Sequence, residues 1–144
     1  RGDKQAFRAV DHDLVLECAA AAKAAGARQL IVLSSVGAQF SSKNFYLSVK
    51  GEVEDKLAKL HFDRLDLIRP GILRGKREGA ARPAERIGMI LSPLVDLLMV
   101  GSLRKYRSAK ASDVARVILR LAGMKQRGRV VHQHDEMQRI LRRG

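Results

Sequence analysis

The chain has 144 residues, of which 46% are hydrophobic, and it carries a formal net charge of +13. This length and apolar content suit a single domain with one core, and no apolar run of about 20 residues predicts a membrane-spanning helix. The charge lies mostly in the second half, where residues 74–144 hold 17 Lys and Arg against 6 Asp and Glu. Such a bias attracts anionic partners. Because Tyr106 is the single aromatic residue of that half, specific nucleic-acid binding is not expected, and we expect an arginine-rich solvated surface.

The chain has one cysteine, Cys18, in an alanine-rich stretch. A single cysteine cannot form an internal disulfide, which is compatible with a reducing compartment. We therefore expect a cytoplasmic protein. We also expect Cys18 to be a small buried side chain.

Helix and strand patterns alternate along the first half of the chain. The expected elements are a helix over residues 10–25, a strand over residues 29–33, a helix over residues 45–60 and a strand over residues 64–69. Gly26 ends the first helix and Pro70 ends the second strand. The continuous apolar run at residues 29–33 is typical of a strand covered on both faces. In the second helix, apolar residues recur at helical spacing and residues 51–56 are expected to be exposed.

The second half of the chain has a looser pattern. The expected elements are a charged loop over residues 76–83, an apolar helical stretch over residues 84–99 that is interrupted at Pro93, a helix over residues 112–121, a strand over residues 129–132 and a helix over residues 136–141. Ser112 is the expected N-cap of the helix over residues 112–121. The alternation indicates an α/β fold with a doubly wound parallel sheet, in which ligands bind at the carboxyl ends of the strands.

Tyr46 and Lys50 lie four residues apart, so they share one face of the expected helix. A fixed positive charge favours the phenolate of a nearby tyrosine, which makes such a pair suitable for proton transfer. Ser34 and Ser35 end the preceding strand, and a serine hydroxyl there can hold a carbonyl or alcohol oxygen beside the phenol. The spacing alone is equally compatible with an amphipathic helix whose lysine faces solvent.

His132 and His134 flank Gln133 near the C-terminus. Histidine is a common metal ligand. Two such residues after a short strand are more often exposed loop residues, and no metal site is assigned.

Four segments in chain order resemble motifs of the short-chain dehydrogenase/reductase superfamily, in its atypical branch. They are residues 30–38 (LIVLSSVGA), 46–54 (YLSVKGEVE), 67–73 (LIRPGIL) and 112–116 (SDVAR). Within that branch the chain is similar to bacterial NAD(P)H-binding proteins related to the Tat-interacting protein (CC3) group. The resemblance runs over essentially the whole chain.

The resemblance implies a role for each residue of the site. Tyr46 is the acid/base, Lys50 holds the nicotinamide ribose and favours the phenolate, and Ser35 orients the reacting oxygen. The residues implied in cofactor binding are Ser34, Lys50, Pro70, Gly71 and Ile72. Ser34 has a cofactor-side or a structural role.

The chain departs from the superfamily pattern in two ways. Where the superfamily commonly has an asparagine for a water-mediated proton relay, this chain offers Asp11, which puts turnover in doubt. The glycine-rich turn that opens a dinucleotide-binding fold does not occur. We therefore expect this chain to be the C-terminal part of one NAD(P)-binding Rossmann-like domain that lacks its glycine-rich β-α-β portion. A further N-terminal segment of roughly 70 residues, one half of such a fold, would carry that portion, and the chain alone would bind dinucleotide poorly.

Within residues 1–144, residues 1–75 would hold the sheet and catalytic helix, and residues 76–144 a basic substrate-side and C-terminal lobe. The implied function is an NAD(P)H-dependent oxidoreductase that acts on a small carbonyl or alcohol, with NADP(H) favoured over NAD(H). The alternative is a regulatory or interaction protein that binds the cofactor with little turnover. RNA or anionic-lipid binding by the basic lobe is a third alternative, and a homo-oligomer is compatible with all three.

Overall fold

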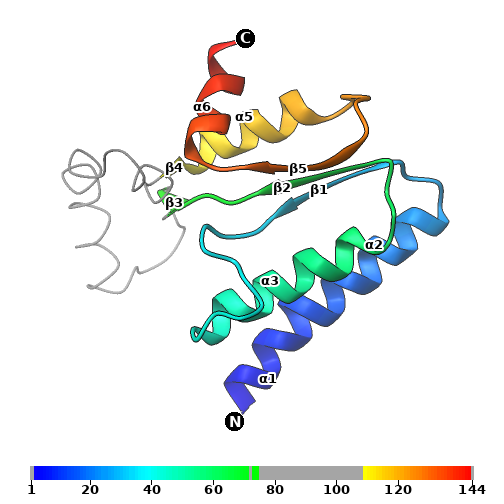
Figure 1. Cartoon of the computed structure of the whole chain (residues 1–144), viewed down its shortest axis with the longest axis vertical. Coiled ribbons are helices and arrows are strands. Elements are labelled where there is room, and N and C mark those ends of the chain that lie inside the picture. The colour runs from blue at the N-terminus through cyan, green and yellow to red at the C-terminus, as the bar shows by residue number, and fades with distance from the viewer. Residues whose placement is uncertain (1, 72, 75–108, 144) are drawn as a thin grey trace.

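The structure is a computed structural model that describes residues 2–71, 73–74 and 109–143 (Figure 1). Three parallel strands form its main sheet in the order β1-β2-β5: β1 (Gln29–Leu33), β2 (Arg64–Ile68) and β5 (Gly128–His132). The two-residue strands β3 (Leu73–Arg74) and β4 (Ala109–Lys110) pair separately. The predicted α/β class with a parallel sheet is confirmed.

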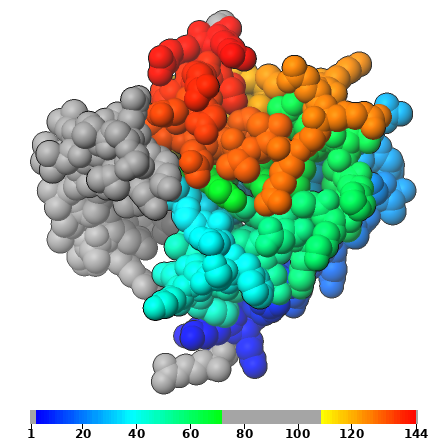
Figure 2. All heavy atoms as spheres, viewed as in Figure 1, coloured from blue at the N-terminus to red at the C-terminus, as the bar shows by residue number. Residues whose placement is uncertain are grey.

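Helices cover both faces of the main sheet. They are α1 (Gly2–Arg8), the π-helical η1 (Ala9–Leu14), α2 (Val15–Ala24), α3 (Phe45–Ala58), α5 (Ala111–Leu121) and α6 (His134–Arg142). The first three form one continuous rod that lies with α3 on one face, and α5 and α6 lie on the other face (Figure 1). Figure 2 shows the α5 and α6 layer, coloured yellow to red, at the opposite side of the molecule from the blue N-terminal rod.

β2 is the central strand, and all five of its residues are buried. Side chains alternate across a strand, so Leu65 and Leu67 pack against α2 and α3, while Ile68 packs against α5 and α6. The charged residues Arg64 and Asp66 share the face of Ile68. β1, in contrast, is half-buried rather than covered on both faces, because no described strand pairs with its outer edge.

Sequence patterns located the regular elements well, with errors at several individual residues. The first helix begins at Gly2 and not at residue 10. Ser112 is not an N-cap: it lies inside α5, which begins at Ala111 and has no side-chain cap. Cys18 is exposed rather than buried, because it lies on the side of α2 that faces away from the sheet core.

Two further expectations of exposure are wrong. The segment at residues 51–56 of α3 is not an exposed face, since Gly51, Val53 and Glu54 are buried. His132 is not an exposed loop residue: it ends β5, and its side chain is buried against Asp66. The charged loop expected at residues 76–83 and the helical stretch expected at residues 84–99 lie outside the described residues. Among the helices that are described, none is long and apolar enough to cross a membrane.

Candidate functional site

Tyr46 and Lys50 occupy the first two turns of α3. Asn44 caps this helix, because its side-chain Oδ1 accepts a hydrogen bond from the backbone N–H of Leu47 at 3.1 Å. The cap fixes where the helix begins and therefore which face carries the two residues. The ammonium of Lys50 lies 5.6 Å from the centroid of the Tyr46 ring. The phenol remains accessible, since Tyr46 is 42% exposed.

The Lys50 ammonium also has an acidic partner. Its Nζ lies 3.3 Å from Oδ1 of Asp11, and the Lys50 side chain is only 14% exposed. Asp11 lies in η1, where the helix adopts π geometry. Short π-helical segments within α-helices are frequently found at functional sites. The lysine therefore lies between the phenol and a carboxylate that comes from a different helix.

The N-terminal rod is held against α3 by ion pairs and rings. Arg8 pairs with Glu52 at 2.7 Å, and the ring of Phe7 packs on that of Tyr46 with centroids 5.2 Å apart. The hydrogen bond from Arg8 lowers the pKa of Glu52 to about 2, and Lys56 contributes in the same direction. These contacts fix Asp11 relative to Lys50.

The segments that follow β1 and β2 run side by side beyond the strands. The backbone N–H of Val36 donates to the carbonyl of Pro70 at 3.1 Å, and that of Ser34 donates to the carbonyl of Ile68 at 2.7 Å. Ser35 and Gly71 therefore lie at the same edge of the sheet, the carboxyl ends of the strands. The sequence predicts this shared edge, because both segments directly follow strands of a parallel sheet.

The two serines at this edge have different environments. Ser34 is buried, and its hydroxyl donates to Oε2 of Glu54 at 2.6 Å. The hydroxyl of Ser35 is half-buried and makes one long bond, to the carbonyl of Val36 at 3.2 Å. No hydrogen bond joins Ser35 to Tyr46 or Lys50 within the described residues. Ser34 thus has a partner inside the protein, whereas Ser35 is the serine that can turn its hydroxyl toward a ligand. Ile72, the remaining predicted site residue, lies outside the described residues.

Glu54 is a residue that the sequence analysis missed. It is 1% exposed, and it accepts hydrogen bonds from Ser34 after β1 and from Arg69 after β2. The hydrogen bond that Arg69 donates to Glu54 raises the pKa of Arg69. Glu54 follows Lys50 by four residues, so the spacing of Tyr46, Lys50 and Glu54 was the available signal. Through this carboxylate, α3 is tied to the ends of both strands.

Gly51 allows the loop after β1 to lie directly on α3. A Cβ atom at this position would lie 2.4 Å from the backbone nitrogen of Phe40. The contact is reinforced because Ser48 donates its hydroxyl to the carbonyl of Phe40 at 2.8 Å and Gln39 donates its N–H to the carbonyl of Leu47 at 3.1 Å. The loop that begins at Ser35 is therefore held at a fixed position relative to Tyr46.

A second group of charged side chains is buried on the other face of the sheet. Asp66 is fully buried and accepts hydrogen bonds from Arg64, Gln29 and His132. Burial by itself raises the pKa of Asp66, but the bonds from His132, Arg64 and Gln29 outweigh burial and lower it to about 2. In the part of the chain that is described, no group of three or more His, Cys, Asp or Glu side chains has an arrangement that could hold a metal ion.

Comparisons with known proteins agree with this picture in part. No protein-family model matches the chain. It is 51% identical over 79 residues to protein HTATIP2 of Rattus norvegicus, a match that covers 55% of this chain and 32% of that protein. It is 38% identical over 116 residues to the mitochondrial protein fmp52 of Emericella nidulans, which covers 81% of this chain and 48% of that protein. The chain is thus similar to part of HTATIP2 and of FMP52.

Protein FMP52 of Candida albicans, also mitochondrial, is 32% identical over 121 residues, which covers 84% of this chain and 52% of that protein. The chain thus spans about half or less of the length of these curated relatives. These similarities support the resemblance to the Tat-interacting protein group. The mitochondrial location in the names of the fungal relatives does not fit the cytoplasmic location that was expected.

Proposed function

We propose that the chain forms the catalytic part of an NAD(P)H-dependent oxidoreductase of the atypical short-chain dehydrogenase/reductase type, with a Rossmann-like fold. The observation that carries the proposal is the Lys50 ammonium, 5.6 Å from the Tyr46 ring centroid, on a helix that Glu54 ties to the carboxyl ends of β1 and β2. An accessible phenol beside a partly buried ammonium is suited to acid/base catalysis.

The residues at this edge fit a nicotinamide cofactor. When bound, the cofactor would supply or accept a hydride. Lys50 would hold the ribose, Ser35 would accept or donate a hydrogen bond at the substrate oxygen, and Gly71 would allow close approach because it has no side chain. In the reductive direction the Tyr46 hydroxyl gives its proton to the substrate oxygen and becomes a phenolate, which the charge of Lys50 stabilises. A small carbonyl or alcohol is the proposed substrate, and NADP(H) the proposed cofactor.

A test is the oxidation of NADPH and NADH by the full-length protein with a panel of aldehydes and ketones. Removal of the acid/base group in Tyr46→Phe should lower kcat by about 100-fold or more. The matched change at the neighbouring ring, Phe45→Leu, should keep most of the wild-type kcat. Turnover that is the same in wild type and Tyr46→Phe would contradict the proposed mechanism.

A second candidate is a cofactor-binding regulator with little turnover, and the Asp11 contact favours it. A carboxylate 3.3 Å from the Lys50 ammonium offsets part of the positive charge that would stabilise the phenolate. Under this alternative, NADPH binds but no carbonyl is reduced. Asp11→Asn discriminates between the two, because it restores full charge at Lys50. A variant that gains turnover would support the regulator as the natural state, and one that loses turnover would support the enzyme. The cellular location remains a prediction that fractionation can test.

A further inference from the structure

Three hollows adjoin one another around Met124, which lines all of them and is 39% exposed. The first, about 310 Å³, lies where β1 and β2 begin. The second, about 210 Å³, lies between β5 and α6, and the third, about 270 Å³, lies against the end of α6. We call these three hollows the Met124 groove.

The rim of the Met124 groove is strongly basic. The cations that line it, apart from Arg64, are Arg28, Arg120, Lys125, Arg127, Arg139 and Arg143. Two carboxylates lie among them, Asp63 and Glu136, and their ion pairs with Arg127 and Arg139 are long, at 3.7 and 3.8 Å. The rim therefore carries a clear excess of positive charge.

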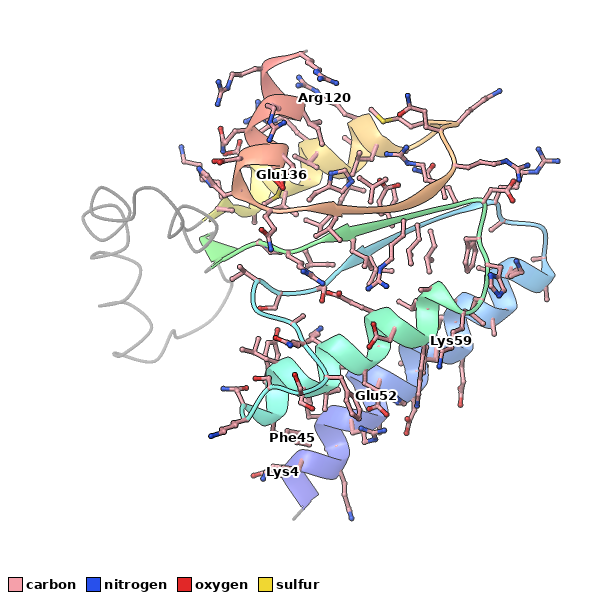
Figure 3. The ribbon with its side chains drawn as sticks, in the orientation of Figure 1. Lys4, Phe45, Glu52, Lys59, Arg120 and Glu136 are labelled. Carbon is pink, nitrogen blue, oxygen red and sulfur yellow. The ribbon has the colours of Figure 1, made fainter. Side chains whose placement is uncertain are left out.

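Several of these cations lack an acidic partner. Within the described part of the chain, no carboxylate lies within 4.0 Å of Arg28, Lys125 or Arg143. Arg120 donates to the carbonyls of Ile140 and Leu141 in the last turn of α6 and has no carboxylate partner among the described residues. The labelled Arg120 and Glu136 lie in the α5 and α6 layer, on the far side of the sheet from Lys59 (Figure 3). Arg64, in contrast, is buried and forms an ion pair with Asp66.

Apolar side chains form part of the floor of the groove. They are Met124, Leu121, Val130 and Ile140, and they lie beside the buried Arg64 and His132, both of which pair with Asp66. Methionine is flexible and polarisable, so it adapts to different apolar partners. No Phe, Tyr or Trp side chain lines any of the three hollows, and His132 is buried against Asp66, which removes the base-stacking contacts that single-stranded nucleic acid uses. A lipid surface is flat and would reach the rim but not the concave floor.

We propose that the Met124 groove binds an acidic peptide segment that places an apolar side chain on Met124 and its carboxylates on the basic rim. Charge complementarity selects this occupant, because apolar side chains inside a rim with an excess of cations match a segment in which Leu or a similar residue stands among Asp and Glu. The first hollow lies at the starts of β1 and β2, roughly 16 Å from their carboxyl ends for five residues at about 3.3 Å each. The other two hollows lie on the face of the sheet that α5 and α6 cover, whereas Tyr46 and Lys50 lie on α3, on the opposite face (Figure 1). The two sites therefore do not compete.

The test is fluorescence anisotropy with the full chain and a short fluorescein-labelled peptide that carries two leucines among Glu and Asp residues. Two further peptides replace either the acids with Gln or the leucines with Ser. In the protein, Lys125→Glu combined with Arg127→Glu reverses two rim charges. The control, Lys43→Glu combined with Lys59→Glu, makes the same change in net charge at exposed positions outside the groove.

We expect the groove variant to bind the acidic peptide about tenfold more weakly than wild type, and the control variant to change affinity by less than about twofold. Both replacement peptides should bind more weakly than the acidic peptide, and Met124→Ser should reduce binding only of the peptides that keep their leucines. Circular dichroism checks that every variant is folded. Equal losses in the groove and control variants, or tighter binding of oligothymidylate than of the peptide, would overturn the proposal. The second outcome would favour a nucleic acid instead.

Discussion

Replacement of Glu54 by glutamine probes the connection between α3, which carries Tyr46 and Lys50, and the two strand ends. The Glu54→Gln change keeps the shape of the side chain, so it opens no cavity, and an amide oxygen can still accept from Ser34. It removes the charge that Arg69 bonds through Nε at 3.0 Å and through a second nitrogen. The change therefore removes the buried ion pair with Arg69, together with a longer one to Arg129 at 3.7 Å.

The expected cost follows from how deeply the pair is buried. Removal of one partner of a fully buried pair costs about 3–5 kcal/mol. Glu54 is 1% exposed, but the Arg69 side chain is 20% exposed and partly hydrated, so we expect a loss of about 2–3 kcal/mol in the free energy of unfolding. For a chain of this size the corresponding fall in Tm is roughly 4–12 °C.

The assay is urea denaturation followed by circular dichroism, with Asp55→Asn as the matched control. Asp55 is the next residue in α3, and Asp55→Asn removes the same charge. Because the Asp55 side chain is 57% exposed, this variant should lose no more than about 0.5 kcal/mol in the free energy of unfolding. If both variants lose the same small stability, the carboxylate of Glu54 does not hold the helix to the strands, and the reasoning is refuted.

Three further predictions concern the site and its support. Gly51→Ala gains about 1 kcal/mol of helix propensity, but it places a Cβ atom 2.4 Å from the Phe40 nitrogen. Overpacking should outweigh that gain, so urea denaturation should show that the free energy of unfolding falls by about 1 kcal/mol. A variant as stable as wild type would contradict the close approach. The pKa of Asp66 in the folded protein is about 2, against a reference value of 3.8. Its ionised form therefore contributes about 2 kcal/mol to the free energy of unfolding, fully present above pH ~4 and lost as the pH falls toward ~2. The stability difference between wild type and Asp66→Asn should shrink by that amount over this range, and a difference that does not change with pH would contradict the lowered pKa. Lys50→Met should weaken NADPH binding in a fluorescence titration by about tenfold, whereas Lys43→Met should leave the affinity unchanged. If Lys50→Met binds NADPH as tightly as wild type, Lys50 is not part of the cofactor site.

The regular elements were predictable because their signals are local. The strand at residues 29–33 was predicted at its observed bounds from four consecutive apolar residues, and β2 ends one residue before the predicted position, next to Pro70. The start of the first helix at Gly2 was missed because the π turn at residues 9–14 shifts the apolar spacing on which helix prediction depends.

The buried charges were not predictable, because each depends on partners far along the chain. Glu54 is buried because Arg69 approaches it from the end of another strand, and Asp66 is buried because His132 lies on the neighbouring strand. A single sequence without this pairing places acidic residues at the surface by default. The same limit explains why His132 was expected to be exposed.

The candidate site was partly predictable. The shared helix face of Tyr46 and Lys50 and the shared edge of the strands both follow from periodicity and topology. The ion pair between Asp11 and Lys50 does not, since it depends on how the N-terminal rod packs against α3. The sequence left open whether Ser34 has a cofactor-side or a structural role, and the hydrogen bond from Ser34 to Glu54 favours the structural one.

The most direct test of the proposed cofactor site is a map of backbone amide chemical shifts in the full-length protein as NADPH is added. The account predicts that the largest changes occur at Ser35, Tyr46, Lys50 and Gly71, at the carboxyl ends of the strands, and that Lys125 in the Met124 groove is unchanged. Changes centred on the Met124 groove, with the signals of Tyr46 and Lys50 unmoved, would contradict it.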